Sequence, residues 1–397
     1  MKIHKRYIAY LILLMFFLYG INNFIFERRF FFNEILSFLG LLLFLKKVVL
    51  VAKHGKVSIP RSPIYKVVLF IILLGVFQLF ISLFTKTSWY FYLRNSVIIY
   101  SIFTFFLCYY LYPYLSSFVQ GVRAGLQIYV AYALYKPSIA LLERFMGTAF
   151  FPFLFKRNTI FTLFAVFILD ILLAIRYESL TVIILTFLLF VLLLIQRYVY
   201  FKAIVLSGAI IFAVCFVAFI PAFQQYKASR YSLFGDIKKV AKQHFLLQLD
   251  GNSTWRAVFW YRLIVEKFPN NLIGIGFGTP LLPYKKGMDT VESNYDDEHD
   301  IHVTGAHNTY LTVATRLGLA FWLFLLLIYR QIFREFYFYR KYYLSQTTDY
   351  WLMISFFSVS IVGLFNLVLE SPTGASLYWG LLGFVAHAIE KRKLAFA

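Results

Sequence analysis

Charged residues are scarce in this chain, which argues against an ordinary soluble protein. Asp, Glu, Lys and Arg make up 14% of the 397 residues, whereas hydrophobic residues make up 61%. Soluble domains carry about 25% charged and about 45–50% apolar residues. The composition therefore indicates an integral membrane protein. In such a protein the net charge of +21 matters through the side of the membrane on which each basic residue lies, rather than as a sign of nucleic-acid binding.

Cysteine is almost absent, and several catalytic signatures are missing. Cys108 and Cys215 both lie in apolar runs, so the sequence implies no disulfide framework. The chain has no P-loop, no Cys-x-x-Cys pair and no nucleophile elbow. These absences argue against ATP-driven transport, a zinc site and a serine hydrolase. In contrast, the 48 Phe and 30 Tyr residues are typical of membrane-interface belts and lipid-facing surfaces.

Long apolar runs recur along the chain, and a helix needs about 20 mostly apolar residues to cross a bilayer. The stretch 120–155 fits either one helix or two. The clear candidates are residues 8–26, 31–44, 67–84, 95–111, 159–174, 180–195, 203–220, 310–329, 350–369 and 375–389.

The distribution of Lys and Arg favours two helices in that stretch. With twelve helices and a cytoplasmic N-terminus, most basic residues fall in cytoplasmic segments, including Lys391, Arg392 and Lys393. Eleven helices would place the large polar loop inside. The first apolar run lacks a small-residue cleavage site, so we expect a retained helix rather than a signal peptide.

We therefore expect an all-α polytopic membrane protein with about 12 transmembrane helices and one large periplasmic loop. Its parts are N-terminal transmembrane helices (1–220), the loop (221–308) and C-terminal transmembrane helices (309–397). Within the loop, apolar residues at helical spacing predict an amphipathic helix, followed by a flexible Gly-rich turn. These apolar residues are Val258, Phe259, Leu263, Ile264 and Phe268.

His307 is the first candidate for chemistry because it lies in GAHNTYL, at the predicted outer end of a membrane helix. A neutral imidazole can accept a proton from a hydroxyl near physiological pH. Asn308 and Thr309 follow directly and are placed to orient it or the substrate. The alternative is a histidine that caps an interfacial helix.

Four arginines are candidates for substrate binding. Arg256 and Arg262 lie on the predicted amphipathic helix, where a guanidinium can hold a phosphate with two hydrogen bonds. Contact with phospholipid headgroups, or a salt bridge to Glu266, is the alternative. Arg176 begins a helix at its outer end and either faces a cavity or extends to the interface. Arg316 lies inside a predicted membrane helix, where charges usually face a polar cavity or a partner.

Two further patterns are weaker indications of a functional site. Gly274, Gly276 and Gly278 permit a positive φ or a close backbone approach, but no strand precedes them, so they do not predict a dinucleotide site. The acidic tract 296–302 contains oxygen ligands that suit hard cations. Such tracts are more often solvated loops, and we expect no metal.

Two motifs, WRAVFWYRLIVEKFPNNLIGIGFG and HNTYLTVATRLGLAFW, resemble the shared region of the O-antigen ligase and O-antigen polymerase superfamily of bacterial polytopic glycosyltransferases. The resemblance covers about residues 252–328. It extends more weakly to the helix that begins at Arg176 and to NLVLESPTGASLYWGLLG near the C-terminus.

The resemblance implies a multi-pass enzyme of the bacterial inner membrane with its active site facing the periplasm. Such enzymes transfer a glycan from undecaprenyl pyrophosphate to a sugar hydroxyl, without a nucleotide sugar, metal or other cofactor. Arg256 matches the arginine that would hold the pyrophosphate, and His307 matches the histidine that would activate the acceptor. Arg176 matches a helix-start arginine, although Ile175 stands where the family has Ser or Thr. Glu370 matches an acid that would orient His307 or the acceptor.

Ligase and polymerase share these motifs and differ in the acceptor, which is lipid A core or another repeat unit. The helix number and single large loop favour the ligase. A lipid-linked glycan flippase or other transporter is a more distant alternative, since it predicts internal repeats and broken helices. A non-catalytic scaffold of a glycan assembly complex is a third.

Overall fold

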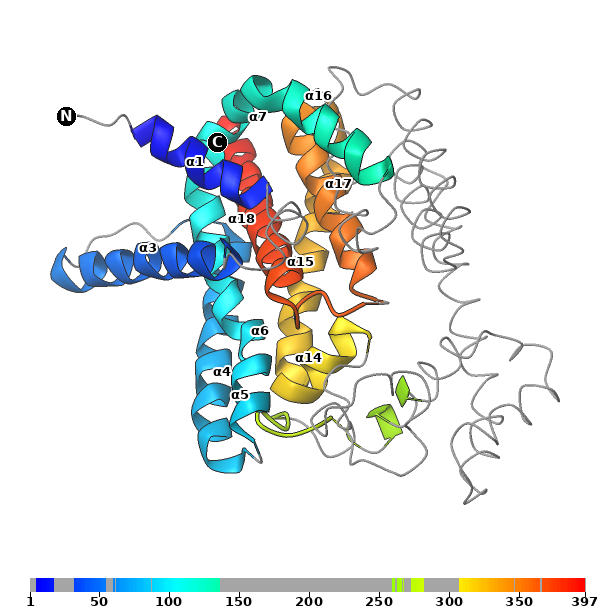
Figure 1. Ribbon diagram of the computed structural model, residues 1–397. Coiled ribbons are helices and arrows are strands. Elements are labelled where there is room, and N and C mark those ends of the chain that lie inside the picture. Colours follow the sequence, from blue (N-terminus) through cyan, green and yellow to red (C-terminus); the bar gives the residue numbers. More distant parts are fainter. Residues whose placement is uncertain are drawn as a thin grey trace.

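The structure is a computed structural model. It describes residues 5–17, 32–54, 60, 62–86, 88–135, 259–260, 263–265, 267, 273–281, 307–345, 347–364 and 366–396. All regular elements within these ranges are helices (Figure 1). They are α1 (Lys5–Phe17), α3 (Phe32–His54), α4 (Pro63–Thr85), α5 (Trp89–Asn95), α6 (Val97–Tyr100), the 3₁₀ turn η1 (Ser101–Phe103), α7 (Thr104–Tyr135), α14 (Thr309–Leu317), α15 (Leu319–Phe338), α16 (Arg340–Ser345), α17 (Thr347–Val362) and α18 (Pro372–Ala395).

Three helical stretches in the described part of the chain are long and apolar enough to cross a membrane. They are Phe32–Lys53, Pro63–Thr85 and Trp89–Gly121. The prediction of a helical membrane protein is thereby confirmed in its coarse form. The predicted spans 159–174, 180–195 and 203–220 and most of the predicted loop lie outside the described residues, so the number of about twelve spans stays a prediction.

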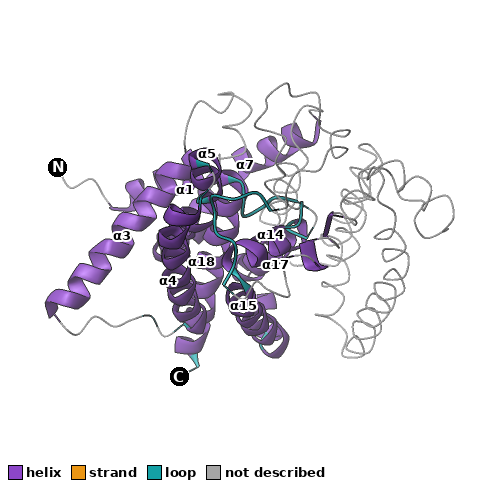
Figure 2. Ribbon diagram, turned by 90° about the horizontal axis from the view of Figure 1, so that it is seen from below, coloured by secondary structure: helices purple, strands orange, loops and turns teal. Residues whose placement is uncertain are grey.

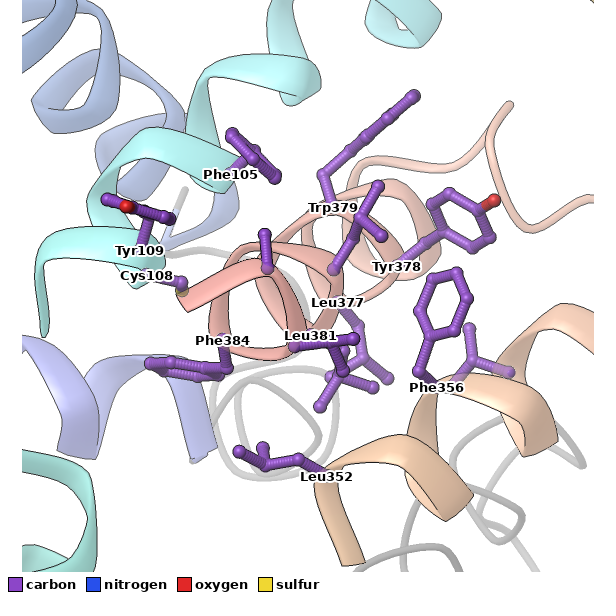
Figure 3. Close-up of a cluster of buried hydrophobic side chains, with 14 of the residues drawn as sticks. Phe105, Cys108, Tyr109, Leu352, Phe356, Leu377, Tyr378, Trp379, Leu381 and Phe384 are labelled. Atoms are coloured by element: carbon purple, nitrogen blue, oxygen red, sulfur yellow. The ribbon is translucent and has the colours of Figure 1, made fainter. Parts of the chain in front are cut away.

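The core is built around α18, which packs against α7 and α17 (Figure 3). Phe105 and Cys108 of α7 lie on one side of α18, and Phe356 of α17 lies on the other. Gly383 lets the backbones approach closely, because a Cβ there would overlap the carbonyl oxygen of Phe105. Cys108 is a free, buried thiol, in agreement with the expectation that it forms no disulfide.

One predicted span is two helices. The run 310–329 is interrupted at Gly318, whose φ of 81° ends α14 before α15 begins. Both flanks are apolar, so hydropathy alone does not reveal the break. The last predicted spans also shift, since α17 ends at Val362 and residues 366–371 connect it to α18 without helix.

Helix α3 extends further than predicted. It runs from Phe32 to His54 and therefore includes Lys46 and Lys47, which the sequence reading placed in a cytoplasmic loop after residue 44. Lysine is a good helix former. Lys46 and Lys47 therefore end the apolar run, but the helix continues through them.

Different helices lie at the two ends of the helical bundle. The end of α4, with α5 and α14, lies at one end, and α16 and the later part of α7 lie at the opposite end (Figure 1). Figure 2 looks onto the first end, where connecting segments cross the helix ends. In the predicted topology this first end, which contains His307, faces the periplasm.

Candidate active site

His307 lies immediately before α14 in an unusual backbone conformation. Its φ of 47° is the only positive value among the described residues other than glycine. Histidine adopts this left-handed region more readily than most residues, but the conformation still costs about 1 kcal/mol or more and persists where surrounding contacts hold it. Asn308 follows as the N-cap of α14, and its Oδ1 accepts a hydrogen bond of 3.1 Å from the backbone N–H of Leu311. His307 is thus presented at a capped helix end.

Thr309 connects this helix end to the α17–α18 connection. Its backbone N–H donates to the carbonyl oxygen of Gly363 at 2.8 Å. Its hydroxyl oxygen accepts from the N–H groups of Val368 at 2.7 Å and Leu369 at 3.1 Å. The hydroxyl also donates to Oε2 of Glu370 at 2.5 Å. One buried side chain therefore fixes Glu370 close to the start of α14.

The two carboxylate oxygens of Glu370 differ in their hydrogen bonding. Oε1 is buried and has no hydrogen-bond partner among the described residues, while Oε2 is held by Thr309. Burial raises the pKa of this carboxyl, and the hydroxyls of Thr309 and Thr312 and the charge of Arg316 act in the opposite direction. Such a carboxyl can accept a hydrogen bond from a hydroxyl, or hold a proton, beside Thr309 at the start of α14.

Arg316 has partners inside the protein. Its side chain is 0% exposed, and Nη1 donates to the carbonyl oxygens of Gly276 at 3.0 Å and Thr279 at 3.1 Å. The expectation that a charge in this position meets a partner is therefore met. Its predicted contact with substrate stays a prediction.

The Gly-rich segment 273–281 is held by the helices around it. Gly274 and Gly276 have φ values of 92° and 78°. A Cβ at Gly274, Gly276 or Gly278 would overlap atoms of α14, of α4 and of the residue after α4, respectively. The prediction of positive φ and close approach is confirmed. Hydrogen bonds from α4, α5 and α14 hold the segment, and the predicted flexibility of the turn stays a prediction.

A small hydrophobic cluster joins the loop to α14. Phe259 and Leu263 are completely buried, as the predicted amphipathic spacing requires, whereas Val265 is 37% exposed. Leu311 of α14, four residues after His307, packs against the cluster. Its members are Phe259, Leu263 and Leu281, with Trp260, Ile275 and Leu311 against them. The cluster therefore joins described residues of the loop to the helix that His307 precedes.

Several predicted groups fall outside the described residues. These are Arg176, Arg256, Arg262 and the acidic tract 296–302. Within the described part, no group of three or more His, Cys, Asp or Glu residues is placed to hold a metal ion.

Three polar residues that hold the site were not predicted from the sequence: Gln78, Ser82 and Asn95 bond the Gly-rich segment. Thr309 was predicted to act beside His307, but its bond to Glu370 was not predicted. The available signal was a polar residue within or beside an apolar run, which requires a partner inside the protein. No protein-family model matches this chain, and no curated protein matches it.

Proposed function

We propose that this protein is a membrane glycosyltransferase that moves a glycan from undecaprenyl pyrophosphate to a sugar hydroxyl. The preferred acceptor is lipid A core, as for O-antigen ligases, in surface polysaccharide biosynthesis at the inner membrane. Repeat-unit polymerisation of O-antigen or capsule, with another glycan as acceptor, is the alternative within the same superfamily.

The observation that carries the proposal is that Thr309, two residues after His307, bonds the Glu370 carboxyl at the start of α14. His307 itself precedes this Asn308-capped helix. A histidine base and a carboxyl with one unpartnered oxygen among the described residues suit a reaction in which a sugar hydroxyl must be oriented and deprotonated. The resemblance of the surrounding motifs supports the same reaction.

In the proposed reaction, the acceptor hydroxyl attacks the anomeric carbon of the donor glycan. The hydroxyl proton passes to His307, the bond between the anomeric carbon and pyrophosphate breaks, and undecaprenyl pyrophosphate leaves with the bonding electrons. Pyrophosphate is a good leaving group, and arginines can stabilise its developing charge. Arg256 takes this role on the resemblance. The packing of Phe259 against a cluster that includes Leu311 supports a loop that operates beside α14.

A lipid-linked glycan transporter is the second candidate, because Gly318 breaks the α14–α15 run. Transporters use broken helices near their substrate sites. Reconstituted vesicles distinguish the two functions. A transporter moves labelled lipid-linked glycan between leaflets without forming a new glycosidic bond, whereas a transferase forms the bond when an acceptor is supplied.

The cellular test complements a deletion strain with wild type, His307→Ala or Arg256→Ala. A matched control is His387→Ala, since His387 lies within α18 and bonds the Tyr109 carbonyl oxygen. Gels resolve chain length and attachment to lipid A core, and membrane insertion is checked for each variant.

For a ligase, both site variants leave polymer on the lipid carrier and none on the core, while the control transfers it. Single repeat units on the core indicate the polymerase instead. Wild-type polysaccharide from both site variants would refute this active site.

A further inference from the structure

We propose that Arg316 is a positioning residue that anchors segment 273–281 and thereby sets the place of the periplasmic loop relative to His307. The anchoring itself follows from contacts within the chain. Only its effect on turnover rests on the proposed glycosyl transfer.

Arg316 and the segment contact each other through both backbone and side chain. The N–H of Gly276 donates to the Arg316 carbonyl oxygen at 3.0 Å, and the N–H of Ile275 donates to the Thr315 carbonyl oxygen at 2.9 Å. In return, Arg316 Nη1 donates to the carbonyl oxygens of Gly276 and Thr279. A buried charge is stable only when its donors are satisfied. The segment supplies the carbonyl acceptors that the buried guanidinium needs, and the guanidinium in turn holds the segment against α14.

The opposite side of the segment is held by α4 and α5. The Ser82 hydroxyl accepts from the Phe277 N–H at 3.0 Å, and Asn95 Nδ2 donates to the Phe277 carbonyl oxygen at 2.9 Å. The Ser88 N–H donates to Gly278 at 3.3 Å, and Gln78 donates to the Ile273 carbonyl oxygen. The segment thus lies between α4 and α14, and Arg316 supplies the side-chain contacts from the α14 side.

The anchored segment also contacts described loop residues that come before it in the chain. Leu281 belongs to the cluster that contains Phe259 and Leu263, and Ile275 packs against that cluster. Displacement of the segment would therefore displace these loop residues relative to α14. Since His307 immediately precedes α14, the geometry between the loop and the histidine depends on the Arg316 anchor.

The burial of Arg316 separates this role from direct substrate binding. Its side chain is 0% exposed, and Nη1 donates to two backbone carbonyl oxygens of the segment. An arginine that holds pyrophosphate must present its donors to the ligand. Lysine is expected to replace Arg316 only in part, because an ammonium cannot reproduce the planar geometry of the guanidinium.

The test measures the distance between two spin labels in the full chain in lipid nanodiscs. Cysteines replace Val265 on the loop and Leu323 on α15, which are 37% and 58% exposed, after Cys108 and Cys215 are changed to serine. The parent protein is expected to give a single narrow distance peak. Arg316→Ala broadens or shifts the peak, and Arg316→Lys gives an intermediate result. The lysine variant keeps the test decisive if the alanine variant does not fold.

The matched control is Arg392→Ala, which removes another buried arginine at the opposite end of the bundle. Arg392 pairs with Glu335 at 2.6 Å. Its loss destabilises the protein but is expected to leave the loop distance unchanged. A narrow, unshifted peak in both Arg316 variants would overturn the proposal, and so would an equal broadening in Arg392→Ala.

Turnover of lipid-linked glycan distinguishes positioning from binding. Displacement of reacting groups by about 1 Å can cost roughly 100-fold in rate. Arg316→Ala is accordingly expected to lower kcat by about 10- to 100-fold, with little change in the KM for the donor. A raised donor KM with an unchanged distance peak would instead assign Arg316 to the substrate. If the parent shows no glycosyl transfer, the proposed function fails, and the distance measurement still decides the anchoring.

Discussion

Replacement of Thr309 by valine tests the contact that holds Glu370 near His307. Valine has nearly the same shape but lacks the hydroxyl. The change removes the 2.5 Å bond to Glu370 and the acceptor for the N–H groups of Val368 and Leu369. Both of these residues are completely buried, so water does not readily replace the lost partner.

The magnitude follows from these contacts. A hydrogen bond to a carboxyl contributes about 0.5–1.5 kcal/mol when the carboxyl is protonated and about 1.5–3 kcal/mol when it is ionised, and each buried group left without a partner costs about 1–3 kcal/mol. Local relaxation offsets part of this sum, so we expect Thr309→Val to lower the free energy of unfolding by about 3–5 kcal/mol. For a chain of this length, that loss corresponds to a decrease of about 3–6 °C in the unfolding midpoint.

The assay is thermal unfolding in detergent, followed by tryptophan fluorescence, together with transfer activity of the folded fraction. Thr309→Ser retains the hydroxyl and is expected to retain most of the stability and activity. Ser360→Ala is the second control, since it removes a hydroxyl that donates within α17 to Phe356. If Thr309→Val and Ser360→Ala lower the midpoint equally, Thr309 does not have the central role assigned to it.

Three further outcomes are expected. Burial raises the pKa of Glu370 above its ordinary value of 4.5, so the folded protein retains a proton that the unfolded chain releases; this contribution to stability is complete below that value and lost as pH rises through the folded pKa. Glu370→Gln should therefore flatten the pH dependence of the unfolding midpoint, and an unchanged slope would contradict the shift. Arg392→Ala leaves Glu335 buried without its cation and should cost about 3–5 kcal/mol in unfolding measurements, while folded protein retains glycosyl transfer. Gly276→Ala forces a side chain into φ 78° and an occupied space, which should cost at least about 1–3 kcal/mol, whereas Gly121→Ala, with nothing within 4 Å of its Cβ, should unfold at the wild-type midpoint.

The local sequence pattern was sufficient to predict an element where apolar content or apolar spacing alone defines it. The apolar run 67–84 predicts a helix, and α4 occupies Pro63–Thr85. It begins after Ser62 with proline in its first turn, where the missing N–H has no helical partner to lose. The spacing of Phe259 and Leu263 likewise predicts a buried face, and both residues are completely buried.

Local pattern was insufficient where a helix changed direction without a change in polarity. Leu317 and Leu319 are equally apolar on either side of Gly318, so hydropathy predicts one helix where the structure has two. A glycine permits a positive φ but does not require it. The close packing of the Gly-rich segment against Thr315 and Arg316 accompanies the break.

The sequence by itself indicated a helical protein with membrane-spanning segments, because apolar content and helical period are properties of neighbouring residues. It also identified Arg316 as a charge that faces a polar cavity or a partner, and His307 and Glu370 as candidate site residues. Only the tertiary structure decided the partners of Arg316 and Glu370. Thr309 meets Glu370 across 61 positions, and Arg316 meets Gly276 across 40. Such pairs form when packed helices exclude water from polar groups, so the partner is set by which helix ends are brought together rather than by local sequence.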